Sequence, residues 1–167
     1  SFTGSNETGA ELRKLAAERG AKLQLELGGK NPAIVLADAD LEHALTHVVN
    51  GAMMSTGQKC TATSRAIVDR RIADKFTSML SERIAGLKVG DPLANETQIG
   101  PLVDDKSAQR VAGEVTAAKE AGSELLVGGN VLTGELERGA FVAPALFADV
   151  DPSSRLGQDE LFGPVLG

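Results

Sequence analysis

The stretch Lys22–Leu36, KLQLELGGKNPAIVL, decides the fold expected for this chain. Residues 22–27 alternate between polar and apolar side chains, which is typical of a strand with one buried face. The turn-forming residues 28–32 end that strand. Residues 33–36 are continuously apolar, which predicts a second strand of the kind that is buried on both faces of a parallel sheet. Two strands in this order favour the α/β class, with a mainly parallel sheet flanked by helices.

Helix and strand patterns alternate in both directions from this stretch. Apolar residues recur at helical spacing after the turn at Ser5, and again after the segment Asp38-Ala39-Asp40, which we expect to cap the helix that leads to Gly57. The remaining expected elements are helices over residues 72–84 and 104–121, and strands over residues 65–68, 124–127, 141–142 and 145–147. This alternation supports the same fold class.

Composition narrows the function classes. The 167 residues include 17 basic and 23 acidic side chains, giving a net charge of −6, and no basic cluster marks a surface for nucleic acid or an anionic membrane. The single cysteine forms no internal disulfide, and no apolar run reaches the roughly 18 residues needed to span a bilayer. We therefore expect one globular unit in a cytoplasmic setting, with no nucleic-acid or membrane partner.

That single cysteine, Cys60, is the candidate nucleophile. It lies in the segment STGQKCTAT, residues 55–63, between a helix pattern and a strand pattern. A thiol is the most nucleophilic side chain near neutral pH once its pKa is lowered or its proton is removed. The flanking residues are small and polar. The alternative interpretation is that Cys60 is a small buried hydrophobe.

Two further positions stand at the expected edge of the sheet. Glu26 ends a strand, where ligands bind in open α/β sheets, although a solvated glutamate is the alternative. The turn from Gly4 to Gly9 joins a strand to a helix and suits a phosphate group, although ordinary helix capping is the better explanation from these residues alone.

His43 and His47 stand four residues apart on the helix before Cys60. They lack the His-Glu-x-x-His order of a zinc protease and any evident third ligand, so no metal site is predicted.

Four motifs together resemble the aldehyde dehydrogenase superfamily, in the order found there: residues 2–5 (FTGS), 25–32 (LELGGKNP), 57–60 (GQKC) and 160–164 (ELFGP). Family members are roughly three times longer, so the resemblance implies a central segment. Residues 1–27 would end the dinucleotide-binding domain, and residues 28–167 would form the catalytic domain, truncated at its C-terminal end. The segment around Cys60 is most similar to that of bacterial 2-oxoglutarate semialdehyde (2,5-dioxopentanoate) dehydrogenases.

The resemblance implies a catalytic pair. Cys60 would attack an aldehyde to give a thiohemiacetal, hydride would pass to NAD or NADP, and Glu26 would activate the water that hydrolyses the resulting thioester. The backbone N–H of Cys60 would stabilise the oxyanion. Its partner Asn side chain lies upstream of residue 1. Lys59 and Thr61 would neighbour the substrate, and Lys59 would attract a carboxylate-bearing aldehyde or else point to solvent.

The resemblance also implies a cofactor site. Ser5 would meet the pyrophosphate within the turn from Gly4 to Gly9, and Glu160 would bind the nicotinamide ribose. The residues assigned to the cofactor in this way are Gly4, Ser5, Gly9, Leu27, Glu160 and Phe162.

Two other functions remain open from the sequence. The chain could be a catalytically silent structural piece of such an enzyme, with exposed sheet edges. A cysteine hydrolase is the third possibility, but neither His43 nor His47 is an obvious base for Cys60. The longer parent enzyme is expected to be a homo-oligomer acting on a small-molecule aldehyde.

Overall fold

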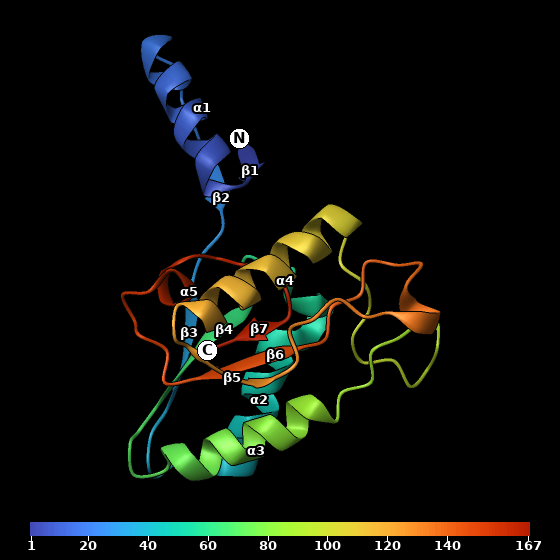
Figure 1. Ribbon diagram of the computed structural model, residues 1–167. Helices are drawn as coiled ribbons and strands as arrows, with labels where there is room; N and C mark the ends of the chain where they lie inside the picture. The colour runs from blue at the N-terminus through green and yellow to red at the C-terminus, as the bar shows by residue number, and fades with distance from the viewer.

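The N-terminal part of the chain forms a β-α-β unit. The computed structural model describes residues 1–167. Strands β1 (Phe2–Gly4) and β2 (Leu25–Leu27) pair in parallel, and helix α1 (Asn6–Glu18) connects them. In Figure 1 this unit stands apart from the rest of the molecule and joins it through the segment that follows β2. The sequence pattern predicted a strand over residues 22–27, but β2 contains only the last three of these residues.

A second parallel pair follows. Strands β3 (Asn31–Val35) and β4 (Thr63–Val68) are joined by helix α2 (Leu41–Met53) and the short 3₁₀ turn η1 (Met54–Gly57). Asp40 caps α2 as expected, because its carboxylate accepts a hydrogen bond from the backbone N–H of His43.

The expectation that β3 is buried on both faces is wrong. Val35 is 3% exposed, whereas Ile34 is 66% and Leu36 is 59% exposed. The hydrophobic core packs against one face of this strand only. Because successive side chains of a strand point to opposite faces, every second apolar side chain of the run is exposed.

The C-terminal part contains a three-stranded sheet. Its strands are β5 (Glu124–Val127), β6 (Ala145–Ala148) and β7 (Val165–Leu166), with β5 antiparallel and β7 parallel to β6. Residues 141–142 form no strand, and Val142 makes only an isolated bridge with Val131. Three of the four strand pairings are parallel, in agreement with the predicted sheet.

Backbone hydrogen bonds join this sheet to β4. The N–H of Ala66 donates to the carbonyl of Gly167 at 2.7 Å, and the N–H of Gly167 donates to the carbonyl of Ser64 at 3.2 Å. The remaining elements are helices α3 (Ala73–Ala85), α4 (Asp105–Glu120) and α5 (Arg155–Gln158) and the 3₁₀ turn η2 (Gly134–Leu136).

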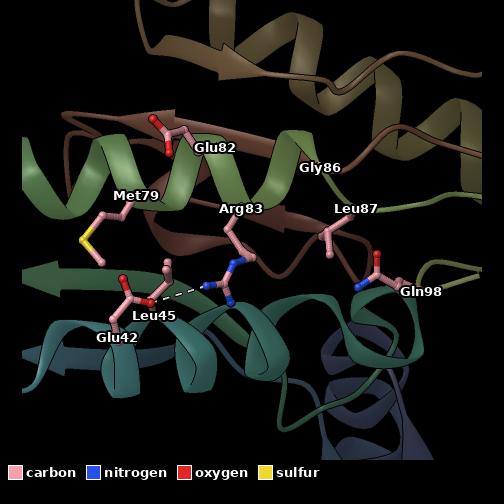
Figure 2. Close-up of a pocket in the computed structure, with 8 residues that line it drawn as sticks. All are labelled: Glu42, Leu45, Met79, Glu82, Arg83, Gly86, Leu87 and Gln98. Carbon is pink, nitrogen blue, oxygen red and sulfur yellow. Dashed lines mark ion pairs between the residues drawn. The ribbon is translucent and has the colours of Figure 1, made fainter. Parts of the chain in front are cut away.

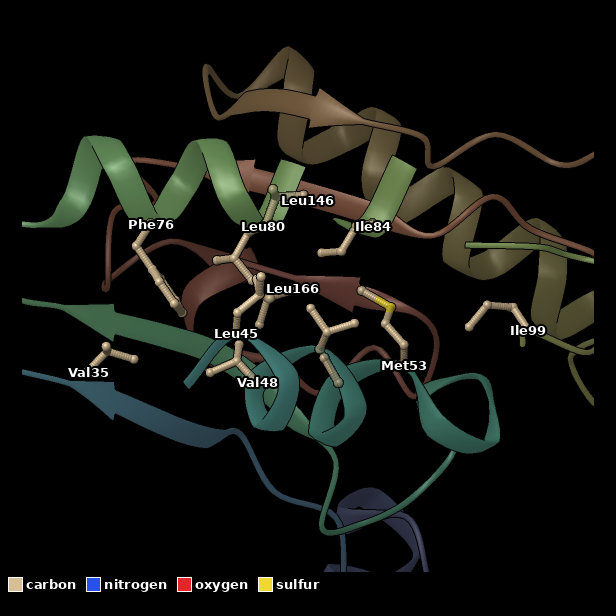
Figure 3. Close-up of a cluster of buried hydrophobic side chains, with 12 residues drawn as sticks. Val35, Leu45, Val48, Met53, Phe76, Leu80, Ile84, Ile99, Leu146 and Leu166 are labelled. Carbon is tan, nitrogen blue, oxygen red and sulfur yellow. The ribbon is translucent and has the colours of Figure 1, made fainter. Parts of the chain in front are cut away.

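Two hydrophobic clusters lie on opposite faces of the joined sheet. Leu146 of β6 and Leu166 of β7 pack into the cluster formed with α2 and α3 (Figure 3). Their neighbours Phe147 and Val165 belong to a second cluster, formed with α4 and α5. Helices therefore cover both faces, with α4 on one side and α2 and α3 on the other (Figure 1). None of the helices is long and apolar enough to cross a membrane.

Candidate active site

The turn that leads to Cys60 has a left-handed backbone. Ser55, Thr56 and Gly57 have φ angles of 55°, 57° and 68°. Only glycine adopts this conformation without strain, so two non-glycine residues here cost free energy that other contacts must offset. The buried Thr56 side chain donates to the carbonyl of Gly100 at 3.2 Å. A side chain on Gly57 would collide with the carbonyl of Gly163.

Gln58 fastens the same turn to a distant loop. Its side-chain oxygen accepts the backbone N–H of Val103 at 2.9 Å, and its side-chain nitrogen donates to the carbonyls of Ser55 and Pro101 at 3.4 and 3.5 Å. The loop bearing the candidate nucleophile is therefore held from the side of residues 100–103 as well as from Gly163.

Cys60 is exposed. Its exposure excludes the interpretation that it is a buried hydrophobe. Its backbone carbonyl accepts a hydrogen bond from the Asn31 side chain at 2.7 Å, and the same amide donates to the carbonyl of Ala62 at 3.1 Å. A side chain on Gly29 would lie 3.8 Å from the Cys60 carbonyl oxygen. The start of β3 thus lies directly beside the nucleophile loop.

Glu26 lies on β2 and is exposed. Its carboxylate accepts a hydrogen bond from the side chain of Gln24 at 3.3 Å. No hydrogen bond links the side chains of Glu26 and Cys60, and Glu26 does not line the cavity beside the nucleophile loop. Thr61 follows Cys60 on the exposed side of the loop.

The N-terminal residues assigned to the cofactor form the turn and helix start of the β-α-β unit. The Ser5 hydroxyl accepts the backbone N–H of Thr8 at 3.2 Å, which makes it an ordinary helix cap. A side chain on Gly9 would lie 2.7 Å from the Leu27 side chain, so Gly9 lets α1 approach β2 closely. A side chain on Gly4 would meet the ring of Phe2.

Glu160 and Phe162 meet Lys59 around a small cavity beside the nucleophile loop. The other residues that line it are Gly29, Lys30, Gly57, Ala62, Thr63, Ser64, Leu161, Gly163 and Val165. Phe162 has a φ of 49° and is 42% exposed. The carboxylate of Glu160 packs against the backbone of Gly28, where any side chain would collide with it. One oxygen of this carboxylate, Oε1, is buried without a hydrogen-bond partner.

Lys30 and Arg65 are two site residues that sequence reasoning missed. Arg65 donates to the backbone carbonyl of Lys30 at 2.8 Å. Burial lowers the pKa of Lys30 to about 8, and the charge of Arg65 contributes to the same shift, whereas Asp159 and Glu160 oppose it. The only sequence signal for Lys30 was its place inside the motif of residues 25–32. Asn31 and Gln58 were missed because their partners are distant in sequence.

Two other features lie outside this group. The rings of His43 and His47 are 4.4 Å apart, and no group of three or more potential metal ligands occurs. A pocket between α2 and α3 contains the Glu42–Arg83 ion pair, at 3.5 Å, and none of the predicted site residues (Figure 2).

An exposed cysteine on a hydrogen-bonded loop, beside the start of a strand, is a candidate site for thiol chemistry on an α/β scaffold. The chain belongs to the aldehyde dehydrogenase family, whose sequence profile matches residues 1–167. It is 43% identical, over 99% of its length, to the alpha-ketoglutaric semialdehyde dehydrogenase of Bacillus subtilis (strain 168), and it covers 34% of that protein.

Solved structures agree with this membership. HpcC from Thermus thermophilus superposes with a TM-score of 0.95 at 42% identity, over 99% of this chain and 33% of that one. A betaine aldehyde dehydrogenase from Staphylococcus aureus, crystallised in complex with NAD⁺, gives a TM-score of 0.96 at 37% identity over the same shares. The chain thus spans about a third of the length of these relatives.

Proposed function

We propose that this chain carries the thiol centre of an NAD(P)-dependent aldehyde dehydrogenase, which oxidises an aldehyde to its carboxylic acid. The observation that carries the proposal is the exposed Cys60 on a loop held by Asn31 and Gln58, in a chain that belongs to this family. Residues 1–27 would then end the dinucleotide-binding domain, and residues 28–167 would belong to the catalytic domain. The separation of the N-terminal unit in Figure 1 supports that division.

The proposed chemistry begins at the thiol. The Cys60 sulfur, as thiolate, forms a bond to the aldehyde carbon, and the carbonyl oxygen becomes an oxyanion beside the backbone N–H of Cys60. A nicotinamide cofactor, when bound, would supply the acceptor for the hydride that leaves this carbon. A thioester on Cys60 remains. Glu26 takes a proton from a water molecule, which attacks the thioester and releases the acid and the thiolate.

The residues present fit a nicotinamide cofactor. The buried, unpartnered Oε1 of Glu160 is an acceptor that a ribose hydroxyl would satisfy, and Phe162 offers an exposed ring beside it. Ser5, in the turn from Gly4 to Gly9, begins a helix whose N-terminal amides suit a pyrophosphate, and Leu27 would face the nicotinamide from β2. NAD⁺ is bound by the S. aureus relative, which favours NAD over NADP here.

A carboxylate-bearing semialdehyde is the proposed substrate. The relative from B. subtilis is named for such a compound, and Lys59 is an exposed cation adjacent to Cys60. Lys59 would attract the substrate carboxylate, with Thr61 on the other side of the nucleophile. We also propose that the parent enzyme is a cytoplasmic homo-oligomer, in accord with the single free cysteine and with the exposed Ile34 and Leu36 on and beside β3.

The decisive test is NADH formation at 340 nm by the full-length protein, with 2-oxoglutarate semialdehyde and pentanal as substrates. Cys60→Ser should lower kcat by about 10³-fold or more, and Glu124→Gln, on an exposed part of β5, is the control. Turnover retained in Cys60→Ser would overturn the nucleophile assignment.

Glu26→Gln separates the two chemical steps. It should slow steady-state turnover while the first burst of NADH persists, because only hydrolysis needs the base. A burst lost in proportion to turnover would contradict this role. The same assay on the 167-residue chain alone tests the alternative that this segment is catalytically silent, which NADH formation would exclude.

A further inference from the structure

We propose that Lys30 is a positioning residue, whose ammonium group holds the carboxylate of Glu160 in place beside the shared cavity without occupying its oxygens. The inference rests on the proposed function, in which Glu160 binds the ribose of the cofactor. It assigns a role to a lysine that contacts neither Cys60 nor the reacting carbon.

The first observation is the shared cavity. Lys30 and Glu160 both line the small cavity beside the nucleophile loop. Lys30 precedes β3, and its backbone is fixed by the hydrogen bond from Arg65 on β4. The backbone of the lysine is therefore held in place beside this cavity.

The second observation is the unsatisfied carboxylate. Oε1 of Glu160 is buried and makes no hydrogen bond, and Nε of Arg65 is likewise buried without a partner. A buried carboxylate oxygen without a partner destabilises the folded protein unless a nearby cation compensates its charge. The other carboxylate oxygen, Oε2, packs against the backbone of Gly28.

The third observation is that the two charges interact without a close contact. No ion pair within 4.0 Å joins Lys30 to Glu160, yet the charge of Asp159 and, next, that of Glu160 raise the pKa of Lys30 against the effect of burial. A direct ion pair would use the lone pairs of the carboxylate. A cation at longer range stabilises its negative charge and leaves Oε1 free to accept from a ribose hydroxyl.

The test is a double-mutant cycle in the full-length protein, with the Kd for NAD⁺ measured by isothermal titration calorimetry. Glu160→Gln and Lys30→Met should each weaken NAD⁺ binding by about tenfold, and the double variant should bind no more weakly than either single variant. Lys30→Arg should restore binding to within about twofold, because it keeps the charge. Lys75→Met, which removes an exposed lysine of α3, is the control.

Kinetics supply the second measurement. Lys30→Met should raise the KM for NAD⁺ and leave kcat within about twofold, because it acts through a cofactor ligand and not on the thiol. If Lys30→Met does not fold, Lys30→Gln takes its place in the cycle.

Two negative results are distinguishable. Unchanged NAD⁺ binding in Lys30→Met, or additive losses in the double variant, would overturn the positioning role while the proposed function stands. Unchanged binding in Glu160→Gln would instead overturn the assignment of Glu160 to the cofactor, and with it the basis of this inference.

Discussion

The side-chain amide of Asn31, at the start of β3, donates a 2.7 Å hydrogen bond to the backbone carbonyl of Cys60, 29 residues further along the chain. The same amide donates a second hydrogen bond to the backbone carbonyl of Ala62, so Asn31 binds the chain at Cys60 and again two residues after it. The position of the thiol is therefore set by a side chain of the neighbouring strand as well as by its own loop.

Asn31→Asp should remove the two hydrogen bonds from residue 31 to the carbonyls of Cys60 and Ala62. A carboxylate cannot donate to the two carbonyl oxygens and is repelled by them, so we expect a loss of about 1–3 kcal/mol in the free energy of unfolding, and a changed rate of Cys60 labelling. Urea denaturation and thiol labelling measure the two effects. Asn95→Asp, in an exposed loop, is the control, and equal effects of both substitutions would contradict the prediction.

Gly57→Ala should be far more costly than the same change at Gly134. Both glycines have left-handed φ angles, 68° and 74°, so both substitutions carry the cost of a strained backbone. That cost is about 1–2 kcal/mol. Only Gly57 also faces a carbonyl, that of Gly163, whereas nothing lies within 4 Å of a side chain at Gly134. Urea denaturation should separate the two variants by about 2 kcal/mol or more. Similar denaturation midpoints for the two variants would contradict the prediction and would mean that the backbone near Gly57 shifts to accommodate the new side chain.

Leu80→Ala tests the core between α2, α3 and the sheet. Leu80 is 3% exposed and lies among the side chains of Figure 3, so its truncation should cost about 2–5 kcal/mol. Leu93→Ala makes the identical change at a side chain that is 90% exposed, and it should cost no more than about 0.5 kcal/mol. Thermal or urea unfolding compares the two. A small loss for Leu80→Ala would show that this cluster is loosely packed.

The local features of the fold were predictable, and the long-range ones were not. The cap of α2 was correctly predicted within residues 38–40, where the structure has it at Asp40, because capping depends on residues close together in the sequence. The exposure of Ile34 was missed because an apolar run carries no information on which layers cover it. The sheet class followed from the alternation of elements, and the antiparallel β5–β6 pair was not anticipated.

In the candidate site, too, local features were predictable from the sequence and long-range contacts were not. Cys60 was predicted as the nucleophile because it is the only thiol and has polar neighbours; the structure shows that it is exposed, and its catalytic role stays a prediction. Gln58 bonds to Val103 across 45 residues, and such a contact has no local sequence pattern. The pKa of Lys30 is lowered only in the folded protein, where the side chain is buried and lies near the charge of Arg65.

Lys30 should also make stability depend on pH. Burial, and next the charge of Arg65, lower its pKa from 10.5 to about 8 in the folded protein. Between these two values the unfolded chain still holds the proton that the folded protein has lost, so the free energy of unfolding should rise as pH increases from about 8 to about 10.5. Below about pH 8 both states are protonated and this contribution is constant.

The measurement is urea denaturation of the wild type and of Lys30→Met at about pH 7, 8, 9 and 10, values that bracket the lowered pKa. The difference between the two proteins isolates the contribution of Lys30, because other titrating groups are common to both. The wild type should gain stability relative to the variant above about pH 8. Parallel curves over the whole range would contradict the lowered pKa.

The hydrogen bonds between Gly167 and the backbone of Ser64 and Ala66 bear on how the chain acquires its shape during synthesis. They join residues about a hundred positions apart, and contacts of such long range slow folding because a large loop must close first. The β3–β4 pair leaves the ribosome long before its neighbour β7. In the interval the apolar side chains of this pair that are buried in the final fold, Val35 among them, would be open to chaperones or to other nascent chains.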